Sequence, residues 1–303
     1  MVSDEKKHSG AEFGKARSRV TAYDWVLVAF FVVLITLCFL PLVNLLARSL
    51  SSADALAARE VGLLPVGLTL QAYELIFNDT TYTWSLAYTA MLTVTVTVVS
   101  LTLTVLCAFP LIFDDMKGKR VFSILMILTI YFHAGTIPNF ILMRDLGLLD
   151  NPLVLVLPNA ISVFNVIVMR SFFFGIPISL KESAEVEGAN PFQVLWKIYL
   201  PLSTPVLATI SLFYAVGRWN GFTDALLYIT EARWQPIQLK LFNIINNMAN
   251  IDTSGVDGVA SMTGMSESLT AATVMFATVP ILLVYPWLQR YFISGVTLGA
   301  VKE

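Results

Sequence analysis

The chain has 303 residues, of which 56% are hydrophobic and only 13% are charged, and its formal net charge is −2 at pH 7. Soluble domains carry about 25% charged residues, so this composition excludes an ordinary soluble protein and indicates one embedded in lipid. No basic stripe runs along the sequence, which argues against a nucleic-acid partner. The two cysteines, Cys38 and Cys107, lie in apolar runs and are expected to be small buried hydrophobes.

Six long apolar runs are predicted to cross the membrane. A bilayer core of about 30 Å needs about 20 apolar residues in a helix, and lipid offers no partner to unpaired backbone groups, so the spans must be helical. The first run is too long for the apolar core of a cleaved signal peptide. The predicted spans cover residues 25–47, 84–113, 121–143, 152–174, 203–228 and 268–289.

The basic residues set the orientation of these spans. Most of the 19 Lys and Arg residues fall in the N-terminal tail or in loops on the same side of the membrane as that tail, and cytoplasmic loops carry such an excess. Both termini are therefore expected in the cytoplasm. The chain divides into a tail (1–24), a first span with its outer loop (25–79), a core of five spans (80–292) with a cytoplasmic loop at 179–201, and a C-terminal tail (293–303).

The loop between the fourth and fifth spans carries helix signals on both sides of a glycine. Ser179 and Glu182 have the spacing of a capping box, and a helix is predicted over Leu180–Glu187. Gly188 suits a left-handed turn at the end of that helix. The alternative is a solvated connection that lies on the lipid headgroups.

A second helix is predicted directly after this glycine. Asn190 is a good N-cap, Pro191 suits the first helical position, and Gln193 can complete another capping box. Pro201 and Pro205 are expected to end this helix and to open the fifth span. Four apolar residues recur at helical spacing and are expected to share one face: Phe192, Leu195, Trp196 and Tyr199. The loop is thus predicted to be a rigid helix–turn–helix.

At fixed spacing this loop resembles the cytoplasmic loop of permease subunits in binding-protein-dependent ABC importers. Glu182-Ser183-Ala184 is followed by three residues and Gly188, and nine more residues lead to Ile198, Tyr199 and Leu200-Pro201. Only Ser183 departs from the family's Glu-Ala-Ala pattern. The segments "YAVGRWNGFTDALLYI" (214–229) and "RYFISGVTLGAVKE" (290–303) are similar to those of MalG-like carbohydrate permeases, and "WQPIQLKLFNII" from Trp234 looks like the LplC/YtcP-type branch.

The resemblance implies a fold, a docking site and a set of partners. The fold would be the all-α, six-helix membrane fold of type I importers, called MetI-like, with a cytoplasmic coupling helix. A separate ATPase subunit would contact Glu182, Ser183, Ala184, Gly188, Ile198, Leu200 and Pro201 in the loop, and Gly299, Ala300, Val301 and Lys302 in the C-terminal tail. The other implied partners are a second ATPase subunit, a second related permease, an extracytoplasmic solute-binding protein, an oligosaccharide and the lipid of a bacterial inner membrane.

The sequence agrees with this division of labour. It has no GxxxxGK[ST] phosphate loop, so the chain is expected to bind no cofactor, and ATP and Mg²⁺ would belong to the ATPase subunits. With only His8 and His133, it shows no convergent acid–base set, no nucleophile with a base and no metal-binding Cys pattern. We therefore expect neither catalytic nor metal-ligating residues. A secondary transporter would favour matched broken helices, and no such pair is visible.

Polar and aromatic residues of the fifth span are candidates for the sugar pathway, because sugar rings have apolar faces edged by hydroxyls. These residues are Tyr214, Arg218, Trp219, Asn220, Phe222 and Asp224. Arg218 either snorkels or pairs with the partner permease, or lines the pathway and favours acidic saccharides. Arg218 and Asp224 are six residues apart, so they would not share a face of a continuous helix and a direct pair is not expected.

Other polar residues are given structural or connecting roles. His133 is expected to be packed and hydrogen-bonded, and Asn139 and Asn165 to join neighbouring helices. The glycines of residues 252–267 predict a flexible outer segment, which is either a slack connection or, by the resemblance, a contact with the binding protein. The sequence therefore predicts an importer permease for an oligosaccharide, with acidic, alginate-like uronates favoured over a neutral oligosaccharide.

Overall fold

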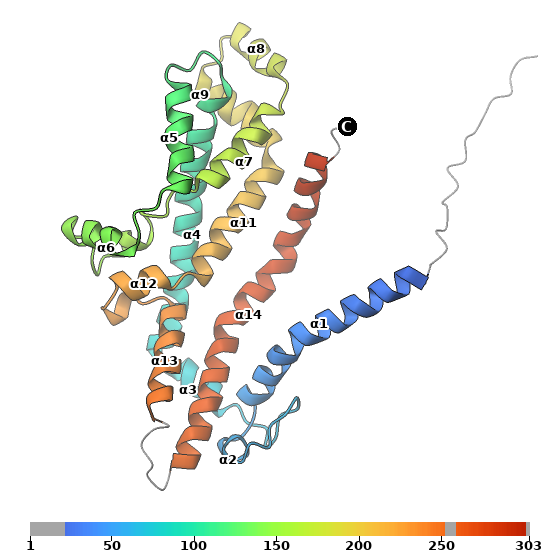
Figure 1. The fold of residues 1–303 in the computed structure, drawn as a ribbon, viewed down its shortest axis with the longest axis vertical. Coiled ribbons are helices and arrows are strands. Elements are labelled where there is room, and N and C mark those ends of the chain that lie inside the picture. Colours follow the sequence, from blue (N-terminus) through green and yellow to red (C-terminus); the bar gives the residue numbers. More distant parts are fainter. Residues whose placement is uncertain (1–21, 252–258, 301–303) are drawn as a thin grey trace, which may run out of the picture.

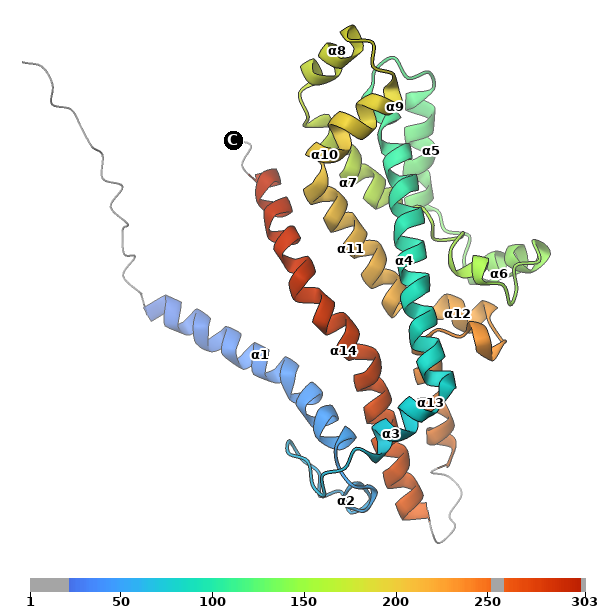
Figure 2. The same cartoon turned by 180° about the vertical axis from the view of Figure 1, so that it is seen from behind.

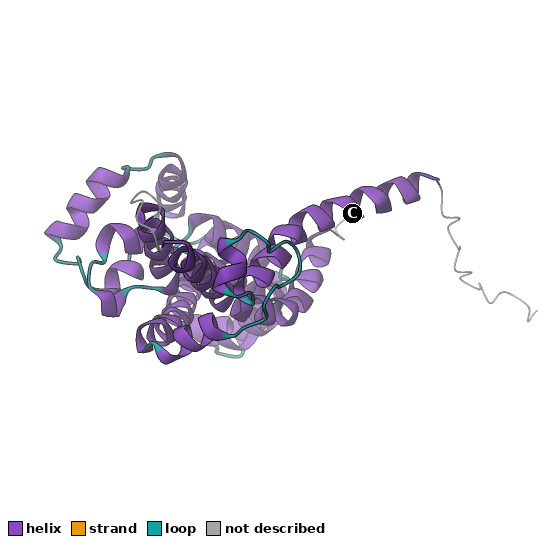
Figure 3. Ribbon diagram, turned by 90° about the horizontal axis from the view of Figure 1, so that it is seen from below, coloured by secondary structure: helices purple, strands orange, loops and turns teal. Residues whose placement is uncertain are grey.

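The computed structural model describes residues 22–251 and 259–300, and every regular element in these ranges is helical (Figure 3). Three helices are long and apolar enough to cross a membrane alone: α1 (Ala22–Ser49), α4 (Thr80–Ala108, extended by the 3₁₀ turn η1, Pro110–Ile112) and α14 (Val259–Ala300). They confirm the first, second and sixth predicted spans. Cys38 is exposed on α1 and Cys107 is partly buried on α4, so the prediction of burial is wrong for Cys38.

Three shorter helices lie alongside α4 (Figures 1 and 2). They are α5 (Lys119–Tyr131), α7 (Val163–Phe174) and α11 (Thr204–Asn220). Each is joined to a bent neighbour, and counting each bent pair as one span gives up to six spans. The remaining elements are α2 (Ala53–Ala57), α3 (Gln71–Asn78), α6 (Thr136–Asp145), η2 (Pro152–Leu155), α8 (Ile178–Val186), α9 (Pro191–Val194), η3 (Leu195–Tyr199), α10 (Leu200–Leu202), α12 (Thr223–Tyr228), η4 (Ala232–Trp234) and α13 (Ile237–Ile251).

The predicted spans at 121–143 and 152–174 are too long, because each contains a break that hydropathy does not register. Helix α5 ends where Phe132 takes an extended conformation, and Gly135 has φ of 88°, after which α6 turns away by 116°. Helix α7 begins only at Val163, where the Ser162 hydroxyl accepts the backbone N–H of Asn165. Each helix therefore covers only part of its predicted span.

The core is built around α4, whose buried face is unusually polar. Its buried residues include Ser85, Thr89, Thr93, Ser100 and Thr104. The hydroxyls of Thr89 and Thr93 donate to carbonyls one turn back at 2.7 Å, so these side chains are small as well as internally satisfied. Small residues let neighbouring helices approach closely without water, and α7 and α11 pack against α4.

The end of the bundle opposite α8 and α9 is formed by α2, α3, α13 and the first half of α14 (Figures 1 and 2). Residues 259–267 are the first turns of α14, so the prediction of a flexible segment over 252–267 is wrong for this part; 252–258 lie outside the described residues. Gly264 explains the close packing here, since a Cβ at this position would meet the Ala53 carbonyl oxygen at 1.9 Å. Arg48 and Glu267 form an ion pair at 3.6 Å across the same junction.

Candidate functional site

The cytoplasmic loop of the sequence prediction folds into two helical segments around Gly188. Helix α8 begins at Ile178, so Ser179 lies inside its first turn, and no side chain caps it at Pro177. The predicted capping box at Ser179 is therefore wrong, although the predicted helix is present to within two residues. Gly188 has φ of 85°, as the left-handed turn requires.

The second segment begins as predicted. The Asn190 side chain accepts the backbone N–H of Gln193, and the Gln193 side chain accepts that of Asn190, each at 2.9 Å. Helix α9 then widens into the π-helical turn η3 before α10, and an 84° bend at Ser203 leads into α11. The loop and the fifth span are thus one continuous, sharply bent helical path.

The inner side of this segment is fixed to the bundle by aromatic packing. Tyr199 is 2% exposed, and its ring meets the edges of Phe109 and Phe173 at centroid distances of 5.2 and 5.5 Å. The Lys181 ammonium lies 4.1 Å from the centre of the Phe113 ring and holds α8 near the end of α4. Three residues of the predicted docking set pack partly against the same cluster: Ala184, Ile198 and Leu200.

The outer side presents apolar residues that nothing in the described part of the chain covers. Phe192 and Trp196 are 67% and 68% exposed, whereas Leu195 and Tyr199 are buried. The four residues were predicted to share one apolar face, and the bundle covers the Leu195 and Tyr199 part of that face while Phe192 and Trp196 stay exposed. Val186, at the end of α8, is also exposed and was missed by the sequence reasoning. The remaining members of the docking set are exposed, namely Glu182, Ser183, Gly188 and Pro201.

The C-terminal residues of the docking prediction are only partly described. Helix α14 runs to Ala300 and ends toward the same end of the molecule as α8 and α9 (Figures 1 and 2). Gly299 and Ala300 are therefore backbone positions in its last turn, while Val301 and Lys302 lie outside the described residues.

The polar residues of the fifth span meet at a break between α11 and α12. Arg218 is 7% exposed, and both terminal nitrogens of its guanidinium donate to the carboxylate of Asp224, one at 3.1 Å. They also donate to the carbonyls of Leu155, at 3.3 Å, and Gly221, at 2.8 Å. The prediction that these two charges do not pair is wrong, because it assumed a continuous helix.

Gly221 makes this pairing possible. It ends α11 in an extended conformation, and the chain turns so that Asp224, in α12, comes back beside Arg218. A Cβ on Gly221 would lie 3.1 Å from the Arg218 guanidinium and 3.1 Å from the Gly217 carbonyl oxygen. A side chain at this position would therefore press on the guanidinium and on the Gly217 carbonyl, each of which would have to shift by a few tenths of an ångström.

Most of the other predicted pathway residues hold helices together. The Tyr214 hydroxyl contacts that of Thr104 at 2.7 Å and accepts the backbone N–H of Ser162. The Trp219 indole donates to the Ala277 carbonyl in α14 at 3.2 Å, and the Phe222 ring packs on a residue of α13, Phe242. Asn220 alone of the six is exposed, so this group offers little free surface to a sugar.

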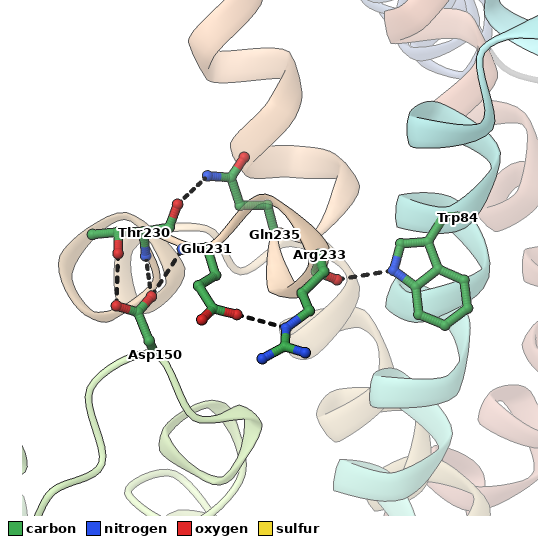
Figure 4. Close-up of polar contacts among 6 residues, drawn as sticks. All are labelled: Trp84, Asp150, Thr230, Glu231, Arg233 and Gln235. Atoms are coloured by element: carbon green, nitrogen blue, oxygen red, sulfur yellow. Dashed lines mark hydrogen bonds and ion pairs between the residues drawn. The ribbon is translucent and has the colours of Figure 1, made fainter.

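A polar staple joins the segments that follow α6 and α12 (Figure 4). Asp150 accepts the backbone N–H and the hydroxyl of Thr230, at 2.5 and 2.6 Å, and the backbone N–H of Glu231 at 2.9 Å. The Trp84 indole of α4 donates to the Arg233 carbonyl at 2.9 Å. These bonds fix the segment that follows α12 to Asp150 and to α4. The sequence reasoning missed this cluster, since Asp150 and Thr230 are 80 residues apart and Trp84 and Arg233 are 149 apart.

His133 and the asparagines complete the predicted polar set. His133 is exposed between α5 and α6 and makes no side-chain hydrogen bond within the described part of the chain, so the prediction that it is packed is wrong. Asn139 is exposed and Asn165 is buried in α7. An open recess of about 490 Å³ lies elsewhere, against α3, and shares no residue with the predicted site; it is lined by Leu50, Leu70, Tyr73, Glu74, Phe77 and Asn78.

Comparison with known proteins assigns this arrangement to a known group. The family described as binding-protein-dependent transport system inner membrane component matches residues 97–298. The polygalacturonan/rhamnogalacturonan transport system permease protein YtcP of Bacillus subtilis is 37% identical over 92% of this chain and 98% of its own length. Protein LplC of the same organism is 37% identical over 87% of this chain and 89% of its own.

A solved structure gives the same picture. A crystal structure of a bacterial ABC transporter involved in the import of the acidic polysaccharide alginate contains a chain with 34% sequence identity and a TM-score of 0.81, covering 89% of this chain and 96% of that chain. At this identity and coverage the likeness extends over most of both chains.

Proposed function

This chain belongs to the binding-protein-dependent transport system inner membrane component family, and from that premise we propose that it carries an acidic oligosaccharide across the membrane. It is a permease subunit of a carbohydrate ABC importer with the MetI-like fold, and a component of the inner membrane. Membership in this family decides against the secondary transporter that the sequence left as an alternative. The sugar, the partner subunits and the orientation are the parts that we propose.

The acidic substrate is supported by two relatives, each of which is named for the transport of a different acidic polysaccharide. One is a permease for polygalacturonan and rhamnogalacturonan, and the other belongs to an alginate importer. Galacturonan and alginate are both built from uronic acids, which carry one carboxylate per sugar. In this chain Arg218 is already neutralised by Asp224, so we place the recognition of those carboxylates elsewhere in the importer, on the binding protein or on the second permease.

The loop from α8 to α10 (residues 178–202), which we call the coupling segment, supports the ATPase partners. Its inner half is fixed by Tyr199, while its outer half exposes Phe192 and Trp196 beside Gly188. Such an apolar patch on a rigid, bent helix is typical of a surface covered by another protein. We propose that each permease of a related pair docks one ATPase subunit here, that ATP and Mg²⁺ are held by those subunits, and that both termini face the cytoplasm.

The substrate is tested by uptake into proteoliposomes that contain the importer and its binding protein. Oligogalacturonate and alginate oligomers are expected to enter in an ATP-dependent way, and arabino-oligosaccharides of equal length are expected not to. Preferential uptake of the neutral sugar would contradict the acidic substrate while leaving the importer function intact.

The docking role is tested by Gly188→Asp. We expect the variant to insert in the membrane but to lose uptake, because a side chain strains the backbone at φ of 85° and projects a charge into the docking surface. Gly118→Asp is the matched control, since Gly118 also has positive φ (81°) and open space around it but precedes α5. Normal uptake by Gly188→Asp, or equal loss in both variants, would argue against docking.

A further inference from the structure

The break between α5 and α6 leaves backbone groups uncovered at membrane depth. Helix α5 starts at Lys119, in a charged loop, and has 13 residues, so it rises about 20 Å at 1.5 Å per residue. The irregular residues Phe132–Gly135 therefore lie well inside a hydrocarbon core of about 30 Å. Within the described chain, the backbone N–H groups of His133, Ala134 and Gly135 form no hydrogen bond.

Lipid cannot face such a segment. Non-helical backbone is found at this depth only where it is buried in protein or lines water, because each unpaired group in hydrocarbon costs several kcal/mol. Among the described residues nothing covers this segment, since Tyr131 and Phe132 are 77% and 75% exposed. α1 provides the contrast: it is equally uncovered, but its backbone is helical throughout and suits lipid.

The side chains at the break between α5 and α6 are of the kinds that bind sugar rings. Two adjacent aromatic rings, Tyr131 and Phe132, stand next to His133, and the exposed Thr136 and Asn139 follow on the first turn of α6. Aromatic faces suit the apolar faces of sugar rings, and the imidazole, hydroxyl and amide suit the hydroxyls at the ring edges. Tyr and Phe are also enriched at protein interfaces, and the cysteine experiment below distinguishes a covered interface from an open pathway.

The break between α5 and α6 is also supported by packing of α6 against α12. Phe140 of α6 stacks on Tyr228 of α12 with ring centroids 6.0 Å apart, and α12 is in turn fixed by the Arg218–Asp224 pair. The exposed aromatic residues are therefore carried on a rigid support that connects, through α11, to the coupling segment. We propose that Tyr131, Phe132 and His133 line the aqueous pathway and contact the transported oligosaccharide, an inference that rests on the proposed function.

Cysteine accessibility tests this proposal in the complete importer. In a background with Cys38→Ala and Cys107→Ala, Phe132→Cys or His133→Cys is exposed to a charged, membrane-impermeant methanethiosulfonate in proteoliposomes. We expect both to react, and to react several-fold more slowly while oligogalacturonate is being transported. Val33→Cys, on the exposed face of α1, is the control for a lipid-facing position and is expected not to react.

Each other outcome overturns a defined part of the proposal. No reaction at Phe132→Cys and His133→Cys would mean that protein or lipid covers the break, and reaction without protection by sugar would remove the sugar contact. Uptake by the cysteine-free background is measured first, because its absence would instead count against the proposed function.

A second measurement keeps the proposal testable if the cysteine variants assemble poorly. Tyr131→Ala and Phe132→Ala are expected to lower the maximal uptake rate by between about twofold and tenfold, the range that one aromatic contact supplies. Leu125→Ala, on the exposed side of the same helix, is expected to leave the rate unchanged. An equal loss in all three variants would indicate damage to α5 and contradict a sugar contact.

Discussion

A charged side chain inside a membrane protein must find its partners within the protein, and Arg218 finds four acceptors. Its guanidinium binds Asp224 with both terminal nitrogens and also bonds to the Leu155 and Gly221 carbonyls. The side chains of Arg218 and Asp224 are 5% and 17% exposed. A pair of this kind is weak evidence for net stability, but leaving one member unpaired is costly. We interpret this ion pair, called the latch below, as the contact that fixes the angle between α11 and α12.

Breaking the latch from one side is expected to cost more than removing it. Arg218→Gln or Asp224→Asn should each lower the free energy of unfolding by about 3–5 kcal/mol, since each leaves the other charge buried alone. The double variant should recover part of that loss. Denaturation of the purified subunit in detergent gives the three values, and losses that simply add would contradict the latch.

The same variants separate a structural role from a sugar-binding one. Because Arg218 already has its partners, Arg218→Gln is expected to reduce the uptake of any transported acidic or neutral oligosaccharide by the same factor. A loss restricted to acidic sugars would show that the arginine reads their carboxylates.

The hydrogen bonds to the Asp150 carboxylate are expected to make the stability of the fold depend on pH. The Thr230 hydroxyl, followed by the backbone N–H groups of Glu231 and Thr230, lowers the pKa of this carboxyl below its ordinary value of 3.8. A lowered pKa in the folded state means that the bonds stabilise the protein fully above pH 3.8 and are lost as the pH falls through the folded pKa. The contribution of Asp150 to the stability of the fold should therefore be constant above pH 3.8 and decrease as the pH falls below that value.

Thermal unfolding between pH 7 and pH 3 measures the effect. Asp150→Asn should unfold at a lower temperature than the wild type at neutral pH, and the difference should shrink below pH 3.8. Asp145→Asn is the control, because within the described residues its carboxylate contacts just the neighbouring Arg144, on the surface. A difference for Asp150→Asn that stays constant with pH would mean that the charge is not involved.

At the scale of the helix, hydropathy predicts where the chain is apolar but not where it bends. The spans that became α1, α4 and α14 were predicted closely, because they are long, uninterrupted and bounded by charge. Of the other three, the spans at 121–143 and 203–228 break at Gly135 and Gly221, and the span at 152–174 is interrupted before Val163. A glycine tolerated in a membrane helix and a glycine that ends one look alike in sequence, so the direct contact between Arg218 and Asp224 could not be foreseen.

Gly264 provides a test of helix packing at the opposite end of the bundle. Gly264→Ala is expected to lower the free energy of unfolding by about 1–3 kcal/mol, because the new methyl group would overlap the Ala53 carbonyl and force α2 away from α14. Gly217→Ala adds the same group to helix α11, where no atom lies within 4 Å, and should be neutral or stabilising. Equal effects of the two substitutions in a melting experiment would contradict the close contact.

Across the whole molecule, one bent helical path runs from the coupling segment through α11 to the break between α11 and α12. The fixed spacing from Glu182 to Pro201 predicted the two helices, the left-handed glycine and the capping box at Asn190, all of which depend on local backbone chemistry. Which apolar residues face inward was not predictable, because that depends on how much of the segment the bundle covers. The structure assigns Tyr199 to the inside and Trp196 to the outside, three residues apart.

This division gives opposite predictions for two neighbouring aromatic residues. Tyr199→Ala should lower the free energy of unfolding by about 3–5 kcal/mol, since it empties a site packed between Phe109 and Phe173. Trp196→Ala should leave the unfolding of the subunit unchanged, because its ring is 68% exposed, yet it should weaken co-purification with the ATPase and reduce uptake. If Trp196→Ala instead destabilised the isolated subunit, or retained the ATPase with wild-type uptake, the outer face of the coupling segment would not be the docking surface, and motion at the ATPase would have to reach α11 by another route.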